Sequence, residues 1–386
     1  MTTSSDLPDL DSLPPELPQS SKTLTAQCHC KSIRFTVTIH ASSLPLPVHL
    51  CHCPTCRYTH GTLCIFHASL PRGIQPEFVA PSSLSNATGY VHPHGALSER
   101  LFCSTCGCHF GDRDLAADKD TGKPEWRVAT SIFDQHGEDT FQIRSHCFTD
   151  SALAGGLYDF LPKMGDRPVH VWNPSKEDKT WPPPPSEKDR PRQEFDERGN
   201  ERLRAKCYCG GVSFTIPRPT IPEVTGDGFI SQFVSPLEKD KWVACLDACN
   251  DCRLVDGTHV TAWTFVPLAL LEPKIGQDLK IGTAKVYQSS EKVLRTFCGV
   301  CGATVFFDCA ERRPSEKSHV IDVAVGILRA PEGVLAERWL TWRSGRVGWL
   351  EDGEGFDPIF ARSLAKGHDE WGRQKYGRSL DFKIPG

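Results

Sequence analysis

A cysteine pattern occurs twice in this chain, and it constrains the fold more than any other feature of the sequence. The first copy reads Cys28-x-Cys30, Cys51-x-Cys53-x-x-Cys56 and Cys103-x-x-Cys106-Gly107. The second copy reads Cys207-x-Cys209, Asp247-x-Cys249-x-x-Cys252 and Cys298-x-x-Cys301-Gly302. Short cysteine pairs that lie far apart in sequence are typical of tetrahedral zinc sites, because folding brings the pairs together around one ion. The pattern therefore predicts a chain whose fold is organised by metal.

The two copies keep a nearly constant offset, which indicates tandem domains. The offset is 196 residues from Cys53 to Cys249 and 195 from Cys103 to Cys298, but only 179 from Cys28 to Cys207. The second copy therefore carries an insertion of 17 residues, which we expect within 217–244. Two copies are too few for a solenoid, so two globular domains are expected.

Composition shifts mark the predicted domain boundaries. Residues 1–22 are acidic and rich in proline and predict a disordered tail. The segment 166–202 contains four consecutive prolines among many charges and predicts a solvated linker. The two zinc domains are then expected at 24–165 and 203–350, with a C-terminal tail at 351–386 that packs on the second domain or frays.

The local patterns predict a mainly β fold with little helix. Alternation of apolar and polar residues, or runs of β-branched and aromatic residues, predict strands at 33–39, 212–216, 262–266, 284–287 and 320–325. The best helix candidate in the first copy is 152–161. Zinc binding explains how small domains with irregular loops remain stable.

Charge and hydropathy exclude several classes of protein. The 386 residues carry a formal net charge of only −4, so we expect no binding of nucleic acid. No apolar run is long enough to span a bilayer, and the N-terminus lacks the basic and apolar regions of a signal peptide. The 18 cysteines are therefore expected as metal ligands or free thiols in the reducing cytoplasm. The pattern predicts no membrane partner and no particular oligomeric state.

The outer cysteine pairs predict closed structural zinc sites. In a Cys-x-x-Cys-Gly turn two thiolates face one ion, and the glycine accepts the positive φ that the turn needs. The remote Cys-x-Cys pair completes four thiolates in each domain. The predicted sets are Cys28, Cys30, Cys103 and Cys106 in the first domain, and Cys207, Cys209, Cys298 and Cys301 in the second.

The middle cluster of the first copy predicts an open site. Cys51, Cys53 and Cys56 supply three thiolates, which leaves a fourth zinc position for water or for an incoming thiol. His52 and His60 are candidates for proton transfer, and Arg57 and Arg100 for binding a carboxylate or for structural ion pairs. Alternatively, Cys64, His52 or His60 closes the site as a fourth ligand.

The middle cluster of the second copy departs from this pattern. Asp247 stands where the first copy has Cys51, and Cys245 lies two residues earlier. The cluster would use Cys249, Cys252 and either Asp247 or Cys245, and a carboxylate ligand would change metal affinity. We expect two zinc ions in the first domain and one or two in the second.

These cysteines resemble the signature of the glutathione-dependent formaldehyde-activating enzyme family, also called the centromere protein V family. The resemblance covers most of residues 24–150 and 203–345, and seven cysteines in order make it specific in the first copy. It implies a zinc-stabilised β-tent of folded-over antiparallel sheets. It also implies structural zinc at the outer pairs and catalytic zinc at Cys51, Cys53 and Cys56, as the spacing suggests.

The resemblance implies a carbon–sulfur lyase that makes or breaks S-hydroxymethylglutathione from glutathione and formaldehyde. The first domain is expected to carry the chemistry, with Cys51, Cys53, Cys56, His52 and Arg57 as the catalytic set and a small thiol such as glutathione as the partner. The alternative is a non-catalytic zinc protein that serves as an interaction scaffold. A fourth protein ligand at the middle cluster would favour the scaffold, and an open position would favour the enzyme.

Overall fold

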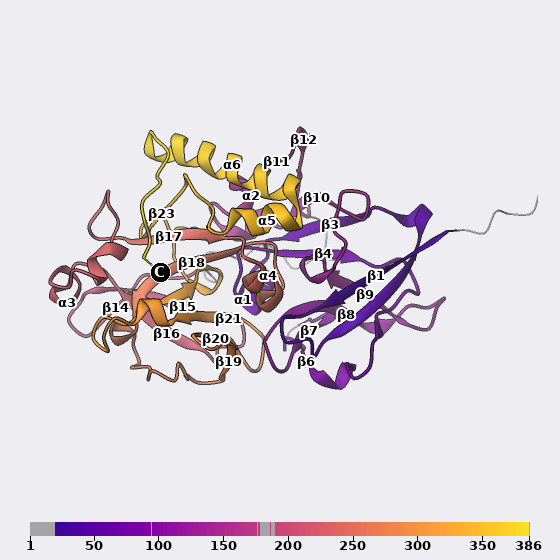
Figure 1. Cartoon of the computed structure of the whole chain (residues 1–386), viewed down its shortest axis with the longest axis horizontal. Helices are drawn as coiled ribbons and strands as arrows, with labels where there is room; N and C mark the ends of the chain where they lie inside the picture. Colours follow the sequence, from indigo (N-terminus) through magenta and orange to yellow (C-terminus); the bar gives the residue numbers. More distant parts are fainter. Residues whose placement is uncertain (1–19, 94, 176, 178–185, 187–189, 386) are drawn as a thin grey trace, which may run out of the picture.

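The structure, a computed structural model, describes residues 20–93, 95–175, 177, 186 and 190–385. It consists of two sheet-rich domains that lie side by side (Figure 1), with few helices. The expected mainly β fold is confirmed. The predicted disordered tail lies outside the described residues up to position 19, and its end belongs to the first strand.

The first domain contains one large sheet and one small sheet. The large sheet has the order β13-β10-β3-β4-β9-β8-β7-β6, and the small sheet has the order β1-β2-β5. The strands are β1 (Ser21–Gln27), β2 (Arg34–His40), β3 (Leu46–Cys51), β4 (Ile65–Ser69), β5 (Glu77–Phe78), β6 (Ala87–Tyr90), β7 (Ser98–Cys103), β8 (His109–Ala117), β9 (Pro124–Ala129), β10 (Phe141–Cys147) and β13 (His170–Trp172). A separate hairpin pairs β11 (Lys163–Met164) with β12 (Arg167–Pro168).

The second domain repeats this arrangement. Its large sheet has the order β19-β20-β21-β22-β18-β17-β23, and its small sheet has the order β14-β15-β16. The strands are β14 (Glu194–Phe195), β15 (Glu201–Lys206), β16 (Ser213–Pro217), β17 (Trp242–Asp247), β18 (Thr261–Pro267), β19 (Ala284–Ser290), β20 (Val293–Cys298), β21 (Thr304–Cys309), β22 (Val320–Ala324) and β23 (Leu340–Trp342). Each of the five predicted strands is present with shifts of three residues or fewer at its ends.

The insertion in the second copy lies where the sequence offsets place it. β2 and β3 are joined by a short turn, whereas β16 and β17 are separated by residues 218–241. That segment contains the short helix α3 (Pro222–Thr225) and a 3-10 turn at Ile230–Phe233. Phe233 and Trp242 are fully buried, so the insertion adds to the core of the second domain.

The two domains contact each other through equivalent residues. The amide of His29 donates to the carbonyl of Leu254 at 3.1 Å, and the amide of Tyr208, the counterpart of His29, donates to the carbonyl of Tyr58 at 2.9 Å. Tyr58 is in turn the counterpart of Leu254. Such exchanged contacts are the mark of an isologous interface, here formed within one chain.

One helix in each domain carries this interface. α1 (Pro54–His60) packs against the 3-10 turn Val325–Ile327 of the second domain, and α4 (Asn250–Asp256) packs against the turn Thr130–Ile132 of the first. The two helices lie close to each other near the middle of the molecule (Figure 1). Because each helix begins beside a middle cysteine cluster, each cluster is supported partly by the other domain.

The segment 351–386, predicted as a tail that packs on the second domain or frays, is helical and packs on both domains. It forms α5 (Leu350–Phe356) and the 19-residue α6 (Pro358–Tyr376), which lies across both domains (Figure 1). The ring of His368 on α6 contacts Phe160 of the first domain at 4.4 Å between centroids and Trp342 of the second at 6.1 Å. Asp357 caps α6 by accepting a hydrogen bond from the Phe360 amide at 2.9 Å.

The predicted linker is partly structured, and the predicted helix is short. β12, β13 and β14 all fall inside 166–202, and β13 pairs with β10 in the large sheet of the first domain. The prolines at 182–185 lie outside the described residues. Instead of a helix over 152–161 the chain forms a 3-10 turn at Thr149–Ala152 and the single turn α2 (Leu157–Phe160), because Gly155 and Gly156 interrupt the segment with positive φ.

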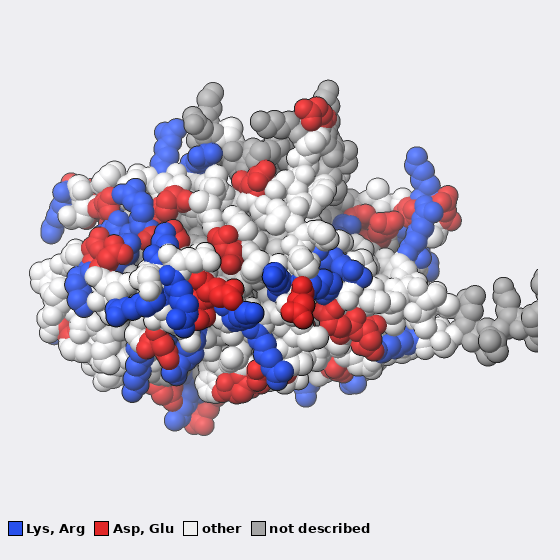
Figure 2. Space-filling model, turned by 90° about the horizontal axis from the view of Figure 1, so that it is seen from above, with Lys and Arg blue, Asp and Glu red and all other residues white. Residues whose placement is uncertain are grey.

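The surface mixes charges of both signs. In the view of Figure 2, Lys and Arg side chains alternate with Asp and Glu over the face that includes α6, and neither sign forms a continuous field. Ion pairs such as Arg373 with Asp369 and Lys375 with Glu337 account for part of this mixing.

Among the residues that the structure describes, no helix combines the length and the apolar character that crossing a bilayer requires.

Candidate metal centres and active site

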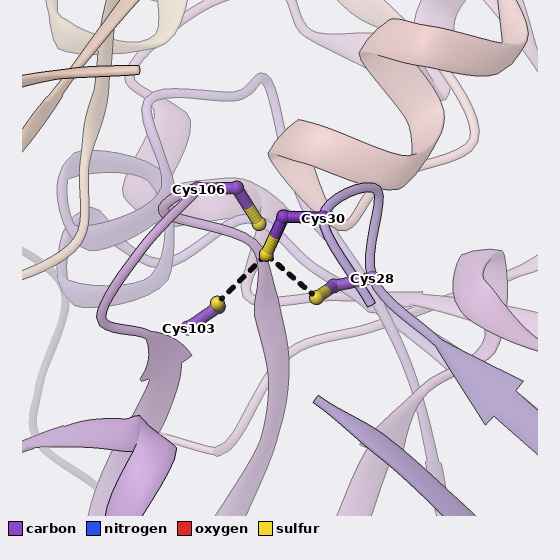
Figure 3. Close-up of side chains that lie close together, drawn as sticks. All are labelled: Cys28, Cys30, Cys103 and Cys106. Carbon is purple, nitrogen blue, oxygen red and sulfur yellow. Dashed lines mark hydrogen bonds between the residues drawn. The ribbon is translucent and has the colours of Figure 1, made fainter. Parts of the chain in front are cut away.

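The outer cysteines of the first domain come together as predicted. Figure 3 shows Cys28 and Cys30, from the turn after β1, facing Cys103 and Cys106, from the turn after β7. All four sulfur atoms lie within 4.8 Å of one another. The Cys30 sulfur is 3.6 Å from that of Cys28 and 3.5 Å from that of Cys103. Because a disulfide bond is about 2.05 Å long, these are free thiols grouped around a common centre, which fits a metal ion.

The backbone turns direct these four sulfurs inward. Gly107 has φ +85°, and its amide donates to the carbonyl of Cys103 at 3.0 Å, which closes the turn between the two cysteines. The amide of Ile33 donates to the Cys28 sulfur at 3.4 Å. Such N–H···S bonds stabilise thiolates, so the backbone supports the negative charge that metal binding creates.

The second domain repeats the outer cluster. Cys207, Cys209, Cys298 and Cys301 lie within 4.8 Å of one another, and the Cys209 sulfur is 3.5 Å from those of Cys207 and Cys298. The supporting bonds also repeat. Gly302 has φ +82°, and the Val212 amide, the counterpart of Ile33, donates to the Cys207 sulfur at 3.3 Å.

The middle cluster of the first domain forms where β3 ends and α1 begins. The sulfurs of Cys51, Cys53 and Cys56 lie within 4.8 Å of one another. Cys53 is the N-cap of α1, and its sulfur accepts a hydrogen bond from the Cys56 amide at 3.4 Å. A helix N-terminus favours a negative group, so the cap position suits a thiolate. Cys51 and Cys53 are partly exposed and Cys56 is buried.

No other His, Cys, Asp or Glu of the described residues joins this middle cluster. Each candidate for a fourth ligand has a different environment. His52 Nε2 is 3.0 Å from Nδ1 of His146, His60 Nδ1 donates to the Cys56 carbonyl at 3.0 Å, and Cys64 is buried outside the group. The three sulfurs therefore offer an incomplete coordination shell.

A buried arginine balances the charge of the middle cluster. Arg100 Nη2 lies 3.7 Å from the Cys56 sulfur, and burial, which disfavours the arginine charge, is outweighed by the Cys56 thiolate and Asp112, so the pKa of Arg100 is raised. Hydrogen bonds from Cys51 and Cys56 lower the pKa of Cys53 well below its usual value. Arg100 thus pairs with a cysteine of the cluster. This is a structural ion pair, one of the two roles that the sequence allowed for this residue.

His52 and Arg57, two predicted catalytic residues, lie beside the cluster in sequence but make their contacts elsewhere. His52 is fully buried against His146 and Tyr158. Arg57 is 3% exposed, donates from Nε to the His52 carbonyl at 3.0 Å, and stacks on Tyr58. Their catalytic roles stay predictions.

The structure places three further polar side chains on the face of Cys51. His49 lies two residues before Cys51 on β3, so the two side chains share a face of the sheet. On the neighbouring strand β10, Ser145 is paired with His49 and Cys147 with Cys51. His49 Nδ1 and Ser145 Oγ are 2.7 Å apart, and partial burial lowers the pKa of His49. The spacing His49-x-Cys51 was the sequence signal, and the sequence analysis missed it.

The middle cluster of the second domain uses Asp247. A carboxylate oxygen of Asp247 and the sulfurs of Cys249 and Cys252 lie within 4.8 Å of one another, and Cys245 is not in the group. Cys245 lies two residues earlier on β17 and lines the cavity beside the cluster. As in the first domain, an arginine supports the last cysteine, because Arg295 Nη1 lies 3.4 Å from the Cys252 sulfur. The alternative with Cys245 as ligand is therefore not favoured by the geometry.

Comparison with known proteins supports the family that the cysteine pattern resembles. The sequence profile of the glutathione-dependent formaldehyde-activating enzyme family matches residues 23–151 and 234–342. No curated protein and no solved structure matches the chain significantly. The second matched region begins after the insertion and so omits Cys207 and Cys209, which the fold nevertheless brings to the outer cluster. Because the two regions cover more than half of the chain, it belongs to the glutathione-dependent formaldehyde-activating enzyme family, as a tandem of two such domains.

Proposed function

We propose that the chain is a zinc-dependent carbon–sulfur lyase that acts on a small thiol adduct such as S-hydroxymethylglutathione. The observation that carries the proposal is the incomplete shell of Cys51, Cys53 and Cys56, which lacks a fourth ligand among the described residues and includes two residues that are only partly buried, Cys51 and Cys53. Family membership supports the connection to glutathione and formaldehyde. A closed cluster would have favoured the scaffold alternative.

The sulfur geometry suits zinc at the outer clusters. Zinc–thiolate bonds of about 2.3 Å in a tetrahedron separate the sulfurs by roughly 3.8 Å, close to the 3.5 and 3.6 Å seen at Cys30. Four thiolates leave no open position, so these two sites would stabilise the domains. Soft thiolate ligands also select zinc over hard cations. We propose two zinc ions in each domain, with the fourth held by Asp247, Cys249 and Cys252.

Zinc at the first middle cluster would supply a position that holds a thiol sulfur in its deprotonated form. In the forward reaction this sulfur forms a bond to the formaldehyde carbon, and the thiol proton ends on the carbonyl oxygen. In the reverse reaction the carbon–sulfur bond breaks with its electron pair on sulfur, the hydroxyl proton is transferred to that sulfur, and formaldehyde leaves. No oxidant or reductant is needed in either direction.

His49 is the residue best placed to move this proton. It is exposed on the face of Cys51, and its lowered pKa keeps the ring neutral at pH 7, so it can accept a proton. Ser145 fixes the ring orientation through its contact with Nδ1. Arg100 donates toward the Cys56 sulfur from the buried side, and its charge favours the ionised form of that thiol.

The experiment is the exchange rate between glutathione, formaldehyde and S-hydroxymethylglutathione, measured by magnetisation-transfer NMR on the full zinc-loaded chain. We expect Cys53→Ser to reduce the rate to that of buffer, with a loss of one zinc and an unchanged circular dichroism spectrum. Cys309→Ser is the control, because Cys309 is buried in the second domain outside all four clusters. Cys249→Ser reports any contribution of the second domain.

Two outcomes would refute the proposal. One is a full exchange rate in Cys53→Ser, and the other is a wild-type rate equal to that of buffer while the middle cluster is shown to hold zinc. A rate lost only in Cys249→Ser would move the chemistry to the second domain.

A further inference from the structure

A cavity opens beside the middle cluster of the second domain. Its inner part has a volume of about 70 Å³ and is lined by Cys245, Asp247, Arg312, Asp322 and Arg343, with aromatic and aliphatic side chains between them. That volume holds several waters or a group of a few atoms. Its outer part, about 450 Å³, lies between the segment 343–351 and α6. The two parts share Arg343, Gly348 and Trp349, so they form one route from the surface toward Asp247.

Three of the four charged groups in the inner cavity already have a partner. Arg312 and Asp322 form a buried ion pair, and Arg312 Nε also donates to the Pro385 carbonyl at 3.0 Å. Asp247 accepts a hydrogen bond from the Cys249 amide at 2.8 Å and belongs to the candidate metal cluster.

Arg343 is the exception. The residue is 8% exposed, and within the described part of the chain its side chain forms no ion pair and no hydrogen bond. Its Nε is fully buried without a partner. Removing a guanidinium from water without an opposite charge costs several kcal/mol in general, so such a residue is retained where a ligand supplies the charge.

The surroundings do not supply that charge. Arg346, on the wall of the outer part, is exposed and paired with Asp381 at 2.8 Å. Glu351 lies on the same wall and is exposed to solvent. Trp349 has φ +53° and a side chain that is 60% exposed, so its indole stands at the junction of the two parts and can cover a bound molecule.

We propose that this cavity is a binding site for a small carboxylic acid, whose carboxylate forms a bidentate pair with Arg343. The planar guanidinium fork matches a carboxylate, and the pair would neutralise the charge that the fold leaves uncompensated. A ligand held in this way extends toward Asp247, so a carboxylate-bearing thiol is the class that would use both the arginine and the cluster. The binding claim stands independently of the lyase reaction in the first domain.

The experiment compares 3-mercaptopropionate with its neutral isostere 3-mercaptopropionamide by isothermal titration calorimetry on the full zinc-loaded chain. The wild type should bind the acid more tightly than the amide. Arg343→Met replaces the guanidinium with an unbranched apolar side chain. It should lower the affinity for the acid by roughly tenfold or more and leave the affinity for the amide unchanged. Both the wild type and Arg343→Met keep the first domain unchanged. Any binding of the two thiols there contributes equally to both proteins, so it does not affect the difference in affinity between them.

Two further variants make the result decisive. Arg362→Met removes an exposed arginine of α6 that lines neither part of the cavity, and it should leave both affinities unchanged. Arg343→Lys keeps the charge without the fork and should give an intermediate affinity for the acid. The melting temperature adds an independent readout, because loss of an unpaired buried charge should leave Arg343→Met at least as stable as the wild type. Equal wild-type affinities for acid and amide would overturn the proposal, as would an Arg343→Met chain that is destabilised yet binds the acid normally.

Discussion

The two middle clusters occupy the same place in two copies of one fold, yet they differ in one of their three candidate ligands. Both begin with a cysteine that caps a short helix, and both helices end at a glycine in the left-handed conformation. In both, an arginine donates to the last cysteine. The first ligand differs, because Cys51 is matched by Asp247. The helix caps and the arginine contacts are therefore the same in both clusters, whereas the first candidate ligand differs.

The environment of the clusters differs more than their ligands do. Among the buried histidines of the first domain are those at positions 52, 60, 67 and 109, and the equivalent positions of the second domain hold Ala248, Asp256, Trp263 and Thr304. The stacked rings of His60 and His109, 3.7 Å apart between centroids, are replaced by a hydrogen bond of 3.1 Å from Thr304 to Asp256. The shared scaffold therefore keeps the cysteine-bearing turns, whereas the core around them has diverged.

The largest effect should come from the part that the domains share. Cys103→Ser and Cys298→Ser each remove a ligand from an outer cluster, and a structural zinc contributes on the order of 10 kcal/mol to folding. Since whole domains are stable by only about 5–15 kcal/mol, each variant should lose its domain's cooperative melting transition. Thermal melting and zinc content check this. If the loss of one outer cluster shifts the melting temperature by only a few degrees, that cluster is not required for its domain to fold. The two copies would then differ in their structural sites.

The next effect tests the interface that joins the copies. Gly61 has φ +76°, and a Cβ there would overlap the backbone carbonyl of Thr304 in the other domain. Gly257 is its counterpart and would meet the carbonyl of His109. We expect Gly61→Ala and Gly257→Ala each to cost roughly 3–5 kcal/mol, combining backbone strain and overpacking.

Gly199→Ala is the matched control for the interface. Gly199 also has positive φ, at +81°, but no atom lies within 4 Å of a Cβ placed there. Its substitution should cost only about 1–2 kcal/mol of backbone strain. Urea denaturation of the three variants separates the two contributions. Equal losses in all three would mean that the contact between the domains adds nothing.

The features that the sequence predicted are those set by local pattern. Strand alternation located the predicted strands, and turn chemistry located the cysteine clusters, because Cys-x-x-Cys-Gly needs only its own backbone to form. The offset between the copies located the insertion before β17. These signals act within a few residues, so they survive without knowledge of the tertiary fold.

Features that depend on packing between distant segments were missed. α6 contains Gly367 and Gly372, which lower helix propensity, yet both allow close approach, since a Cβ would meet the Phe160 carbonyl at one and the Ser344 side chain at the other. His52 and Arg57 adjoin metal ligands in sequence but are directed into the core. The cysteine spacing therefore predicted which cysteines cluster, whereas the catalytic roles of His52 and Arg57 stay predictions. The two-residue strand period relates His49 to Cys51.

A smaller effect concerns the pH dependence that distinguishes the two cores. Burial raises the pKa of Asp256 from its ordinary value near 4 to about 6. A carboxyl group with a raised folded pKa favours folding most below pH 4, and this contribution is lost as the pH rises through 6. The loss amounts to roughly 3 kcal/mol by pH 7. Asp256→Asn, which stays neutral, should therefore lack this part of the pH dependence of the unfolding free energy between pH 4 and pH 6.5.

The control for Asp256 is its hydrogen-bond partner. Thr304→Val removes the hydroxyl group but leaves the carboxyl group in place, so it should lower stability while the pH dependence between pH 4 and pH 6.5 remains. Denaturant titrations at several pH values measure both variants. Parallel curves for Asp256→Asn and the wild type would show that Asp256 does not titrate in this range.

The smallest expected effect tests the ligand difference itself. Asp247→Cys gives the second middle cluster three thiolates, and because thiolate is a softer donor than carboxylate, zinc should bind more tightly there. We expect a gain on the order of tenfold, about 1.4 kcal/mol, measured by competition with a chelator while the outer clusters stay filled. Cys51→Asp is the reciprocal change and should weaken the first cluster by a similar factor. If Asp247→Cys, made in the Cys53→Ser background that inactivates the first domain, binds zinc more tightly at the second cluster but exchanges no S-hydroxymethylglutathione, then the histidines around the first cluster, and His49 on the face of Cys51, carry what the thiolates alone do not supply.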